Sequence, residues 1–259
     1  YVSDLHVNHH VPFVKNQLKW EQRTRGWVRK LSQNKEADVL VIAGDFSEFN
    51  QQSLWVLETF RESYEFVLFV LGNHDYYILS PTQYKQYGDS SGRVHELIRK
   101  AAEIPKVLPL NGHIVEIEGK RIAGESMWYF PQNEADWSFY YERSNDSKHI
   151  YINSGQYDVS SVDVPPYFLH DKSMTWYKWL EDIPIDLMVS HMPPVHPPTS
   201  PHELNGCYHT KVPFLASDQW ICGHQHLKTI FEKAGTTFYM NPIGYPDEKI
   251  TPTIETITI

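Results

Sequence analysis

Short apolar runs alternate with amphipathic stretches through the first half of the chain. The runs at 37–44 and 65–72 each end at glycine, and Tyr1–Asp4 has the character of a strand end. Residues 13–33 and 51–63 instead carry apolar side chains at helical spacing. A buried strand is short, apolar and bounded by turn residues, whereas a helix shows a period near 3.6. This order predicts an α/β fold with parallel neighbouring strands.

The pattern changes after about residue 105, where alternation with a period of two begins. Residues 113–118 and 120–127 alternate on either side of Gly119, which predicts a β-hairpin. A Pro/His-rich loop is expected at 192–206. The later chain otherwise repeats the two earlier patterns, and we expect a helix at 171–181 and strands at 186–190, 219–222 and within 227–259.

Residues 128–168 show no clear period and are rich in Tyr, Trp, Asn, Asp and Ser. A loop of this length is usually functional or disordered, and its aromatic content favours order. We therefore interpret it as an aromatic-rich insertion. The chain contains no internal repeat and no linker, so residues 1–259 are expected to form a single domain.

Composition and charge exclude several classes of protein. Hydrophobic residues make up 41% and charged residues 21%, which excludes disorder, collagen and coiled coil for the chain as a whole. Lys and Arg total 23 against 32 Asp and Glu, and the resulting charge of −9 disfavours broad binding to duplex nucleic acid. No apolar run of roughly 18 residues and no basic-then-apolar start occurs, so we expect neither a membrane span nor a signal peptide.

Two further expectations concern the cysteines and the first residue. Cys207 and Cys222 lie far apart and form no Cys-x-x-Cys pair, so we expect buried or semi-buried thiols and a cytoplasmic protein rather than a disulfide framework. The chain begins at Tyr1, without Met and inside an apolar stretch, so we expect the first strand to be incomplete.

Histidine is unusually frequent, with 14 residues, and it is both a common metal ligand and a proton carrier near neutral pH. Polar clusters follow five of the apolar runs. Each alone is explained as well by a turn or a helix cap. The carboxyl ends of the strands in an α/β sheet lie at one edge, so we expect the five clusters to lie close together in the folded chain. They are Asp4-Leu5-His6, Gly44-Asp45, Gly72-Asn73-His74-Asp75, Ser190-His191 and Gly223-His224-Gln225-His226.

The residue types in these clusters suit a pair of metal ions. Two Asp, one Asn and four His are oxygen and nitrogen donors, as Mn, Fe, Zn, Ni or Co require. Seven ligands with one shared carboxylate supply four contacts to each of two metals. Two dications outweigh two carboxylates and a bridging hydroxide, so the pocket would attract phosphate despite the negative chain. Two ions roughly 3.5–4 Å apart favour an in-line displacement at phosphorus.

The five clusters, in this order, resemble the motifs of the calcineurin-like metallophosphoesterase superfamily. Residues 124–128 and 241–248 also resemble segments of its small bacterial and phage members. The resemblance spans residues 4–226. It implies a four-layer αββα sandwich of two mixed β-sheets flanked by helices.

The resemblance also implies a role for each residue. It assigns to one metal Asp4, His6, Asp45 and His226. It assigns to the other Asp45, Asn73, His191 and His224. We expect two divalent ions, Mn²⁺ ahead of Fe, Zn or Ni. His74 would protonate the leaving oxygen, and Asp75 would orient His74 and raise its pKa. We interpret Glu48 as support for the site, although helix capping explains it about as well.

The function expected is hydrolysis of a phosphoester, with phosphodiesters preferred, by in-line attack of a metal-bridging hydroxide. The substrate is left open, and a nucleotide is among the candidates. Three alternatives are a nuclease on single-stranded DNA or RNA, a phosphomonoesterase or protein phosphatase, and a non-catalytic protein-binding scaffold. The charge argues against the nuclease, and the intact ligand set with His74 argues against the scaffold.

Side chains near these clusters carry weaker signals. The aromatic residues of 128–141 either stack on a base or form the core of the insertion. Arg143 and Lys148 are candidates for phosphate contacts, with ordinary surface charge as the default. The remaining histidines of this group are interpreted as loop residues: His9, His10, His196, His202 and His209.

Overall fold

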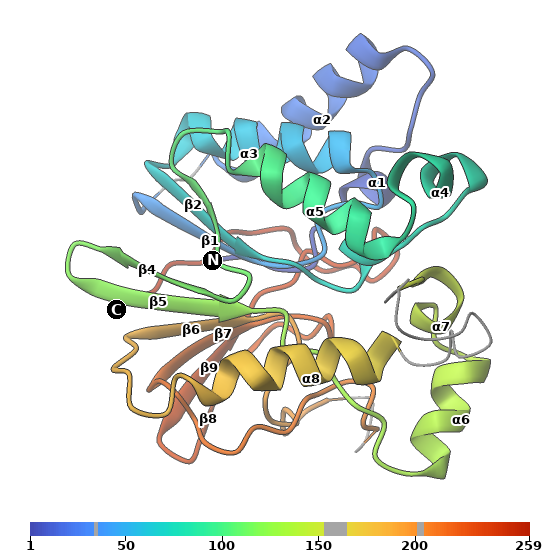
Figure 1. Ribbon diagram of the computed structural model, residues 1–259. Coiled ribbons are helices and arrows are strands. Elements are labelled where there is room, and N and C mark those ends of the chain that lie inside the picture. Colours follow the sequence, from blue (N-terminus) through green and yellow to red (C-terminus); the bar gives the residue numbers. More distant parts are fainter. Residues whose placement is uncertain (34–35, 153–164, 201–204) are drawn as a thin grey trace.

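Two β-sheets pack face to face and helices cover both outer surfaces (Figure 1). The computed structural model describes residues 1–33, 36–152, 165–200 and 205–259. This layering confirms the predicted αββα sandwich. None of the helices in the described part of the chain is both long enough and apolar enough to cross a membrane.

Among the described residues, the first sheet has three parallel strands: β1 (Val39–Ala43), β2 (Phe66–Val70) and β3 (Val107–Pro109). Helices α2 (Gln17–Leu31), α3 (Asn50–Ser63) and α5 (Ser90–Ala101) cover its outer face (Figure 1). Leu40 and Ile42 pack in the cluster with these helices, whereas Val41 and Ala43 pack against the second sheet. Successive side chains of a strand point to opposite faces, so a strand buried on both sides is apolar throughout.

The second sheet is mixed and has the strand order β4-β5-β6-β7-β9-β8. The inner strands β5 (Lys120–Glu125), β6 (Leu187–Ser190), β7 (Gln219–Cys222) and β9 (Thr236–Met240) are parallel. The outer strands β4 (His113–Ile117) and β8 (Thr229–Lys233) are antiparallel to their neighbours. The predicted hairpin at Gly119 is confirmed, and its turn residues Glu118 and Gly119 have φ of 52° and 78°. Positive φ at both positions fits the twist of a two-residue hairpin turn.

The helices differ from the predicted ranges at their ends. Helix α2 starts at Gln17 because the Asn16 side chain accepts a hydrogen bond from the Lys19 N–H, which caps the helix there. Helix α8 (Pro165–Lys178) starts before the predicted 171 and covers the outer face of the second sheet. Helix α5 and strand β3 were not predicted from the sequence. Three short segments were not predicted either: α1 (Val7–His10), the 3₁₀ turn η1 (His74–Tyr76) and α4 (Pro81–Tyr87).

The insertion at 128–168 contains helices α6 (Glu134–Glu142) and α7 (Asp146–His149), at one end of the two sheets (Figure 1). Trp128, Tyr129 and Tyr140 are buried in the cluster that also holds the helices of the first sheet. Residues 153–164 of the insertion and 201–204 of the Pro/His-rich loop lie outside the described residues.

The first residues of the chain connect the two sheets. Val2 pairs with Ile42 of β1, and Ser3 pairs with Pro242 beyond β9, as isolated parallel bridges. The segment predicted as a strand end therefore lies between the two sheets. As a result Asp4 emerges at the same edge as Asp45, which follows β1.

Arg93 on α5 is fully buried and binds the loops that follow β1 and β2. Its guanidinium donates to the carbonyl oxygens of Ser47 at 2.7 Å, His74 at 2.8 Å and Tyr77 at 2.7 Å. It also donates to Asn50 Oδ1 at 3.0 Å. A buried guanidinium is tolerated only when its donors have acceptors, and here they hold the two loops together.

We expect Arg93→Lys to lower the free energy of unfolding by roughly 2–4 kcal/mol, because one ammonium cannot reach all these acceptors and some stay unpaired. Urea unfolding of both proteins measures the difference. Arg99→Lys is the control, since Arg99 lies on the same helix with a 64% exposed side chain. Equal loss of stability in the two variants would contradict the assigned role of Arg93.

Candidate metal centre and active site

The polar residues predicted at strand ends meet at one edge of the two sheets. Asp45 follows β1, Asn73 follows β2, His191 follows β6, and His224 with His226 follow β7. Clusters whose ligand atoms all lie within 4.8 Å of one another contain Asp4, His6, Asp45, His74, His191 and His226. The convergence expected from strand topology is therefore present.

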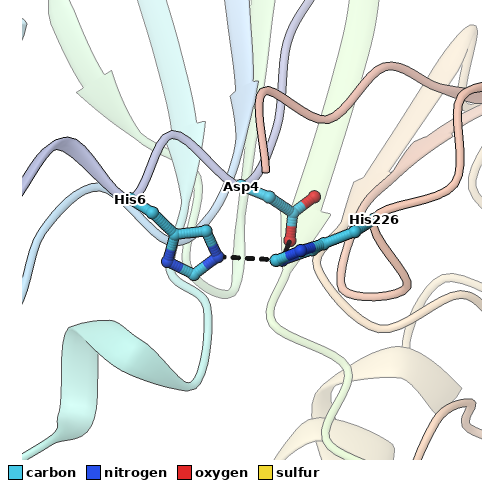
Figure 2. Close-up of side chains that lie close together, drawn as sticks. All are labelled: Asp4, His6 and His226. Atoms are coloured by element: carbon cyan, nitrogen blue, oxygen red, sulfur yellow. Dashed lines mark hydrogen bonds and ion pairs between the residues drawn. The ribbon is translucent and has the colours of Figure 1, made fainter. Parts of the chain in front are cut away.

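Asp4, His6 and His226 surround one point, with both imidazole rings turned toward it (Figure 2). His6 Nε2 lies 2.9 Å from His226 Nε2, and His226 Nε2 lies 3.6 Å from Asp4 Oδ1. Ligands that bind one divalent ion at about 2.1 Å and at angles of roughly 90–110° stand roughly 3.0–3.5 Å apart. The observed separations of 2.9 and 3.6 Å lie just below and just above this range, so small side-chain shifts would accommodate such an ion.

Asp45, Asn73 and His191 form a second group. His191 Nε2 lies 3.0 Å from Asn73 Oδ1 and 3.4 Å from Asp45 Oδ2. His191 Nδ1 donates to the Ala43 carbonyl oxygen at 2.8 Å, so a neutral ring would turn a lone pair toward two oxygens. Burial would lower the pKa of His191, yet the Asp45 carboxylate raises that pKa to about 10. Positive charge between these two oxygens and the ring nitrogen is therefore favoured, and the oxygen and nitrogen donors also suit a divalent metal ion bound to the neutral ring.

The Asp45 carboxylate connects the two groups. Its Oδ1 accepts a hydrogen bond from the backbone N–H of His74 at 2.9 Å. Its Oδ2 lies 3.6 Å from His6 Nε2 and 3.4 Å from His191 Nε2. Burial would raise the pKa of Asp45, but positive charge on His191 and His74 lowers it well below its usual range. One charged oxygen thus faces both groups.

The ring nitrogens that point away from this centre are held by acceptors. His226 Nδ1 contacts Glu248 Oε2 at 2.8 Å, and His224 Nε2 contacts the Cys207 carbonyl oxygen at 3.1 Å. Such partners fix the ring orientation and tautomer of metal-binding histidines. The His224 ring centroid lies 5.2 Å from that of His191, which places His224 beside the second group.

The backbone around the site adopts conformations that side chains ordinarily avoid. Five of the expected ligands have positive φ: Asp4 at 50°, His6 at 41°, Asp45 at 58°, His224 at 70° and His226 at 47°. Such residues cost on the order of 1–3 kcal/mol each and are concentrated at functional sites. Gly72 also leaves no room for a side chain, because a Cβ there would lie 2.1 Å from Asp45 Oδ1. Close approach of the two loops therefore depends on glycine at this position.

The predicted pairing of Asp75 with His74 is wrong. The Asp75 carboxylate accepts hydrogen bonds from the backbone N–H groups of Asp45, Phe46 and Gly72 at 3.0, 3.2 and 2.9 Å. Three amide donors hold it away from the imidazole ring. Burial and the nearby Asp45 charge raise the pKa of Asp75 to about 6.

Glu48 takes the place that was expected for Asp75. Its Oε1 lies 3.0 Å from His74 Nδ1, and its Oε2 accepts from Asn8 Nδ2 at 2.8 Å. Burial would lower the pKa of His74, but the Asp45 and Glu48 carboxylates together raise it. Glu48 thus supports His74, in line with the interpretation of this residue as support for the site.

A cavity of about 450 Å³ opens beside the two groups. His74 lines it, and His74 Nε2 lies 3.1 Å from the Tyr245 hydroxyl. Arg143, Phe139 and Tyr208 line it as well, with the Phe139 and Tyr208 ring centroids 5.6 Å apart.

The side chains that the sequence marked as weaker candidates for substrate contacts differ in their position relative to the cavity. Arg143 lines the cavity and Lys148 does not. The interpretation of His9 and His10 as loop residues is wrong, because both lie in α1. The His9 side chain is 41% exposed, and its Nε2 lies 3.6 Å from Glu48 Oε1 at the edge of the site. His10 Nε2 lies 2.9 Å from the Gly244 carbonyl oxygen.

The remaining candidates are two histidines that pack against each other, two buried cysteines, and one histidine outside the described residues. His196 and His209 pack against each other at 5.6 Å, away from the cavity lining. His202 lies outside the described residues. Cys207 and Cys222 are free and buried, which confirms the prediction of buried thiols.

Sequence reasoning missed four residues that hold the site together: Arg93, Asp146, Tyr245 and Glu248. Tyr245 and Glu248 lie in the segment 241–248, whose family resemblance is visible in the sequence although their contacts are not. Arg93 and Asp146 carry no local signal, because their partners are more than ten residues away.

Comparisons with known proteins identify the family of the chain and a protein of similar fold. The family model of calcineurin-like phosphoesterases matches residues 1–228. No curated protein matches the chain. Among solved structures, the phosphopantetheinyl hydrolase of Mycobacterium tuberculosis is similar in fold, with 18% identity, a TM-score of 0.66 and coverage of 95% of this chain and 89% of the hydrolase. A Staphylococcus aureus structure described as a 5′-nucleotidase matches more weakly, with 12% identity, a TM-score of 0.40 and coverage of 92% and 47%.

We expect a divalent metal to stabilise the protein through Asp45. Mn²⁺ at a hundred times its dissociation constant should raise the free energy of unfolding by about 2.7 kcal/mol, because only the folded chain assembles the ligands. Thermal unfolding with Mn²⁺ and with EDTA measures this. Asp45→Asn should lose most of the gain, whereas His113→Gln, on exposed β4, should keep it. An equal response of both variants would show that the ion binds elsewhere.

Proposed function

The chain belongs to the calcineurin-like phosphoesterase family, and from that premise we propose a binuclear centre with a preference for phosphodiesters. Membership of this family makes the chain a metal-dependent phosphoesterase, and the number of ions and the substrate preference are what we add to it. The observation that supports two ions is the position of Asp45 Oδ2, 3.6 Å from His6 Nε2 and 3.4 Å from His191 Nε2. We propose Asp4, His6, Asp45 and His226 as ligands of one ion. For the other we propose Asp45, Asn73, His191 and His224, with Mn²⁺ as the first candidate metal.

A bound pair of divalent ions supplies a nucleophile by lowering the pKa of water, and neutralises charge on the phosphoryl oxygens. The chain provides the proton for the opposite side of phosphorus. As the phosphorus–oxygen ester bond breaks, the leaving oxygen takes a proton from His74. Glu48, 3.0 Å from Nδ1, stabilises the protonated ring and directs Nε2 toward the cavity. Asp75 then acts indirectly, by holding the loops that carry Asp45 and Gly72.

The cavity supports the preference for diesters. Its volume of about 450 Å³ falls within the range of roughly 300–1,000 Å³ typical of small-molecule sites. A phosphate with one small substituent would leave much of this space empty. Arg143 could pair with an anionic group on the second substituent, and Phe139 with Tyr208 offers aromatic faces to a base. A nucleotide-containing diester combines these features, and we propose this class of substrate.

The proposal is tested by comparing hydrolysis of bis-p-nitrophenyl phosphate and p-nitrophenyl phosphate by the Mn²⁺-loaded protein. We expect kcat/KM to be higher for the diester. His74→Ala should lower kcat by about 10²–10⁴-fold, because the leaving oxygen loses its proton donor, while metal binding persists.

His95→Ala, an exposed position on α5, is the matched control and should retain full turnover. Activity confined to the monoester would overturn the diester preference. Full turnover by His74→Ala would remove His74 from the reaction, and a metal-loaded protein inactive on both substrates would contradict the proposed chemistry.

Arg143 gives a separate prediction about substrate binding. Arg143→Met should raise KM about tenfold for a nucleotide diester with a terminal phosphate and leave kcat nearly unchanged, because the contact is lost in the ground state and the transition state alike. Lys148→Met removes the same charge from the same insertion outside the cavity lining, and should have little effect. Steady-state kinetics of the two variants measures the difference. An equal rise in KM for both would refute the assignment of Arg143 as a substrate contact.

A further inference from the structure

Asp146 is a buried carboxylate in the insertion, at the start of α7, and its side chain reaches the candidate metal centre. Its exposure is 3%. Oδ1 accepts hydrogen bonds from Asn73 Nδ2 at 2.8 Å and from the Tyr77 hydroxyl at 2.6 Å. Oδ2 accepts from the Tyr129 hydroxyl at 2.6 Å. A buried carboxylate needs such donors, and here one of them belongs to an expected metal ligand.

The first consequence concerns the orientation of the Asn73 amide. Its NH₂ group donates to Asp146 and also to the Tyr77 hydroxyl at 3.1 Å. The two ends of an amide have nearly the same shape, so only hydrogen bonds select which end points where. A carboxylate can only accept, and it therefore selects the NH₂ end. This leaves Asn73 Oδ1 directed at His191 Nε2, 3.0 Å away.

The second consequence concerns the two histidine rings nearest the insertion. Tyr77 packs against the His74 ring with centroids 4.3 Å apart. Tyr129 stacks on the His224 ring with centroids 6.2 Å apart and planes inclined by 23°. Both tyrosine hydroxyls donate to Asp146. One carboxylate thus fixes three side chains that contact or form the site.

We propose that Asp146 is a positioning residue for the second metal site, acting through Asn73 directly and through Tyr129 on His224. This proposal rests on the binuclear centre proposed above. Removing the charge frees the Asn73 amide to turn its NH₂ group toward the ion, and loosens the support of His224. Partners of this kind change metal affinity by about 10–100-fold when replaced.

The Asp146 carboxylate also connects the cavity-lining part of the insertion to the candidate metal centre. Arg143, Ser144 and Asn145 directly precede Asp146 and line the cavity. Their position relative to the ions depends on the bonds that Asp146 makes to Asn73 and the tyrosines. Asp146 therefore aligns the wall of the substrate cavity with the ligands of the second ion.

The test is Asp146→Asn, which preserves shape and removes the charge. Calorimetric titration of Mn²⁺ into the metal-free protein should show two sites in the wild type, with one of the two affinities lowered about 10–100-fold in the variant. The affinity of the site built on Asp4, His6 and His226 should stay within about twofold. The electron paramagnetic resonance signal of a coupled Mn²⁺ pair should give way to that of isolated Mn²⁺ at matched metal concentration. Raised Mn²⁺ should restore the coupled signal.

Asp136→Asn is the matched control, because Asp136 is also buried in the insertion but accepts hydrogen bonds from Gln132 N and Asn133 Nδ2, away from the site. It should retain both metal affinities. Tyr129→Phe keeps the ring against His224 and removes one bond to Asp146, so it should give a smaller loss than Asp146→Asn. Circular dichroism of every variant checks that the chain is folded.

Different results of these titrations would contradict the binuclear centre and the role of Asp146. Wild-type protein that binds a single Mn²⁺ would overturn the binuclear proposal itself. Wild-type protein with two sites, together with Asp146→Asn that keeps both affinities within twofold, would overturn the role of Asp146 alone. Equal loss in Asp146→Asn and Asp136→Asn would mean that any damage to the insertion has this effect, and would also overturn it.

Discussion

The Asp45 carboxylate joins the two ligand groups, and much of the nearby structure holds it in place. Its Oδ1 is fixed by the His74 backbone N–H, so that Oδ2 faces both His6 and His191. The backbone at Asp45 is left-handed, and Gly72 leaves no space for a Cβ beside it. Strain of this kind persists only where surrounding contacts overdetermine the conformation. The strained backbone of these loops therefore costs local stability, and it places the Asp45 carboxylate next to the rings of His6 and His191.

Asp75 and Arg93 show how that conformation is stabilised. Asp75 receives three backbone N–H groups from the loops after β1 and β2, and Arg93 donates to carbonyl oxygens of the same loops. One buried anion and one buried cation thus pair the donors and acceptors that two irregular loops would otherwise leave unsatisfied. His74 is then free to pair with Glu48. On the proposed function, Asn73 would bind a metal ion and His74 would transfer a proton, while Asp75 packs the two loops together.

The insertion is best understood as part of the site. It adds aromatic side chains to the core around the first sheet, a cavity wall that carries Arg143, and the buried Asp146. On the proposed function, these parts would connect recognition of the second substituent to the ligands of one ion. That connection runs through hydrogen bonds and ring contacts, so it would be rigid rather than dependent on loop motion.

The sequence by itself determined the α/β class, most strands and the residues at their carboxyl ends. It could do so because apolar runs, glycine stops and polar clusters are local patterns. The pairing of His74 with Glu48 instead of Asp75, and the contacts of Tyr245 and Glu248, were decided by tertiary structure. Asp146 lies 73 residues from Asn73, and Arg93 lies 46 residues from Ser47. Such partners become neighbours only after the strands pair and the layers pack, and hydrogen bonds over that separation leave no periodic trace in the chain.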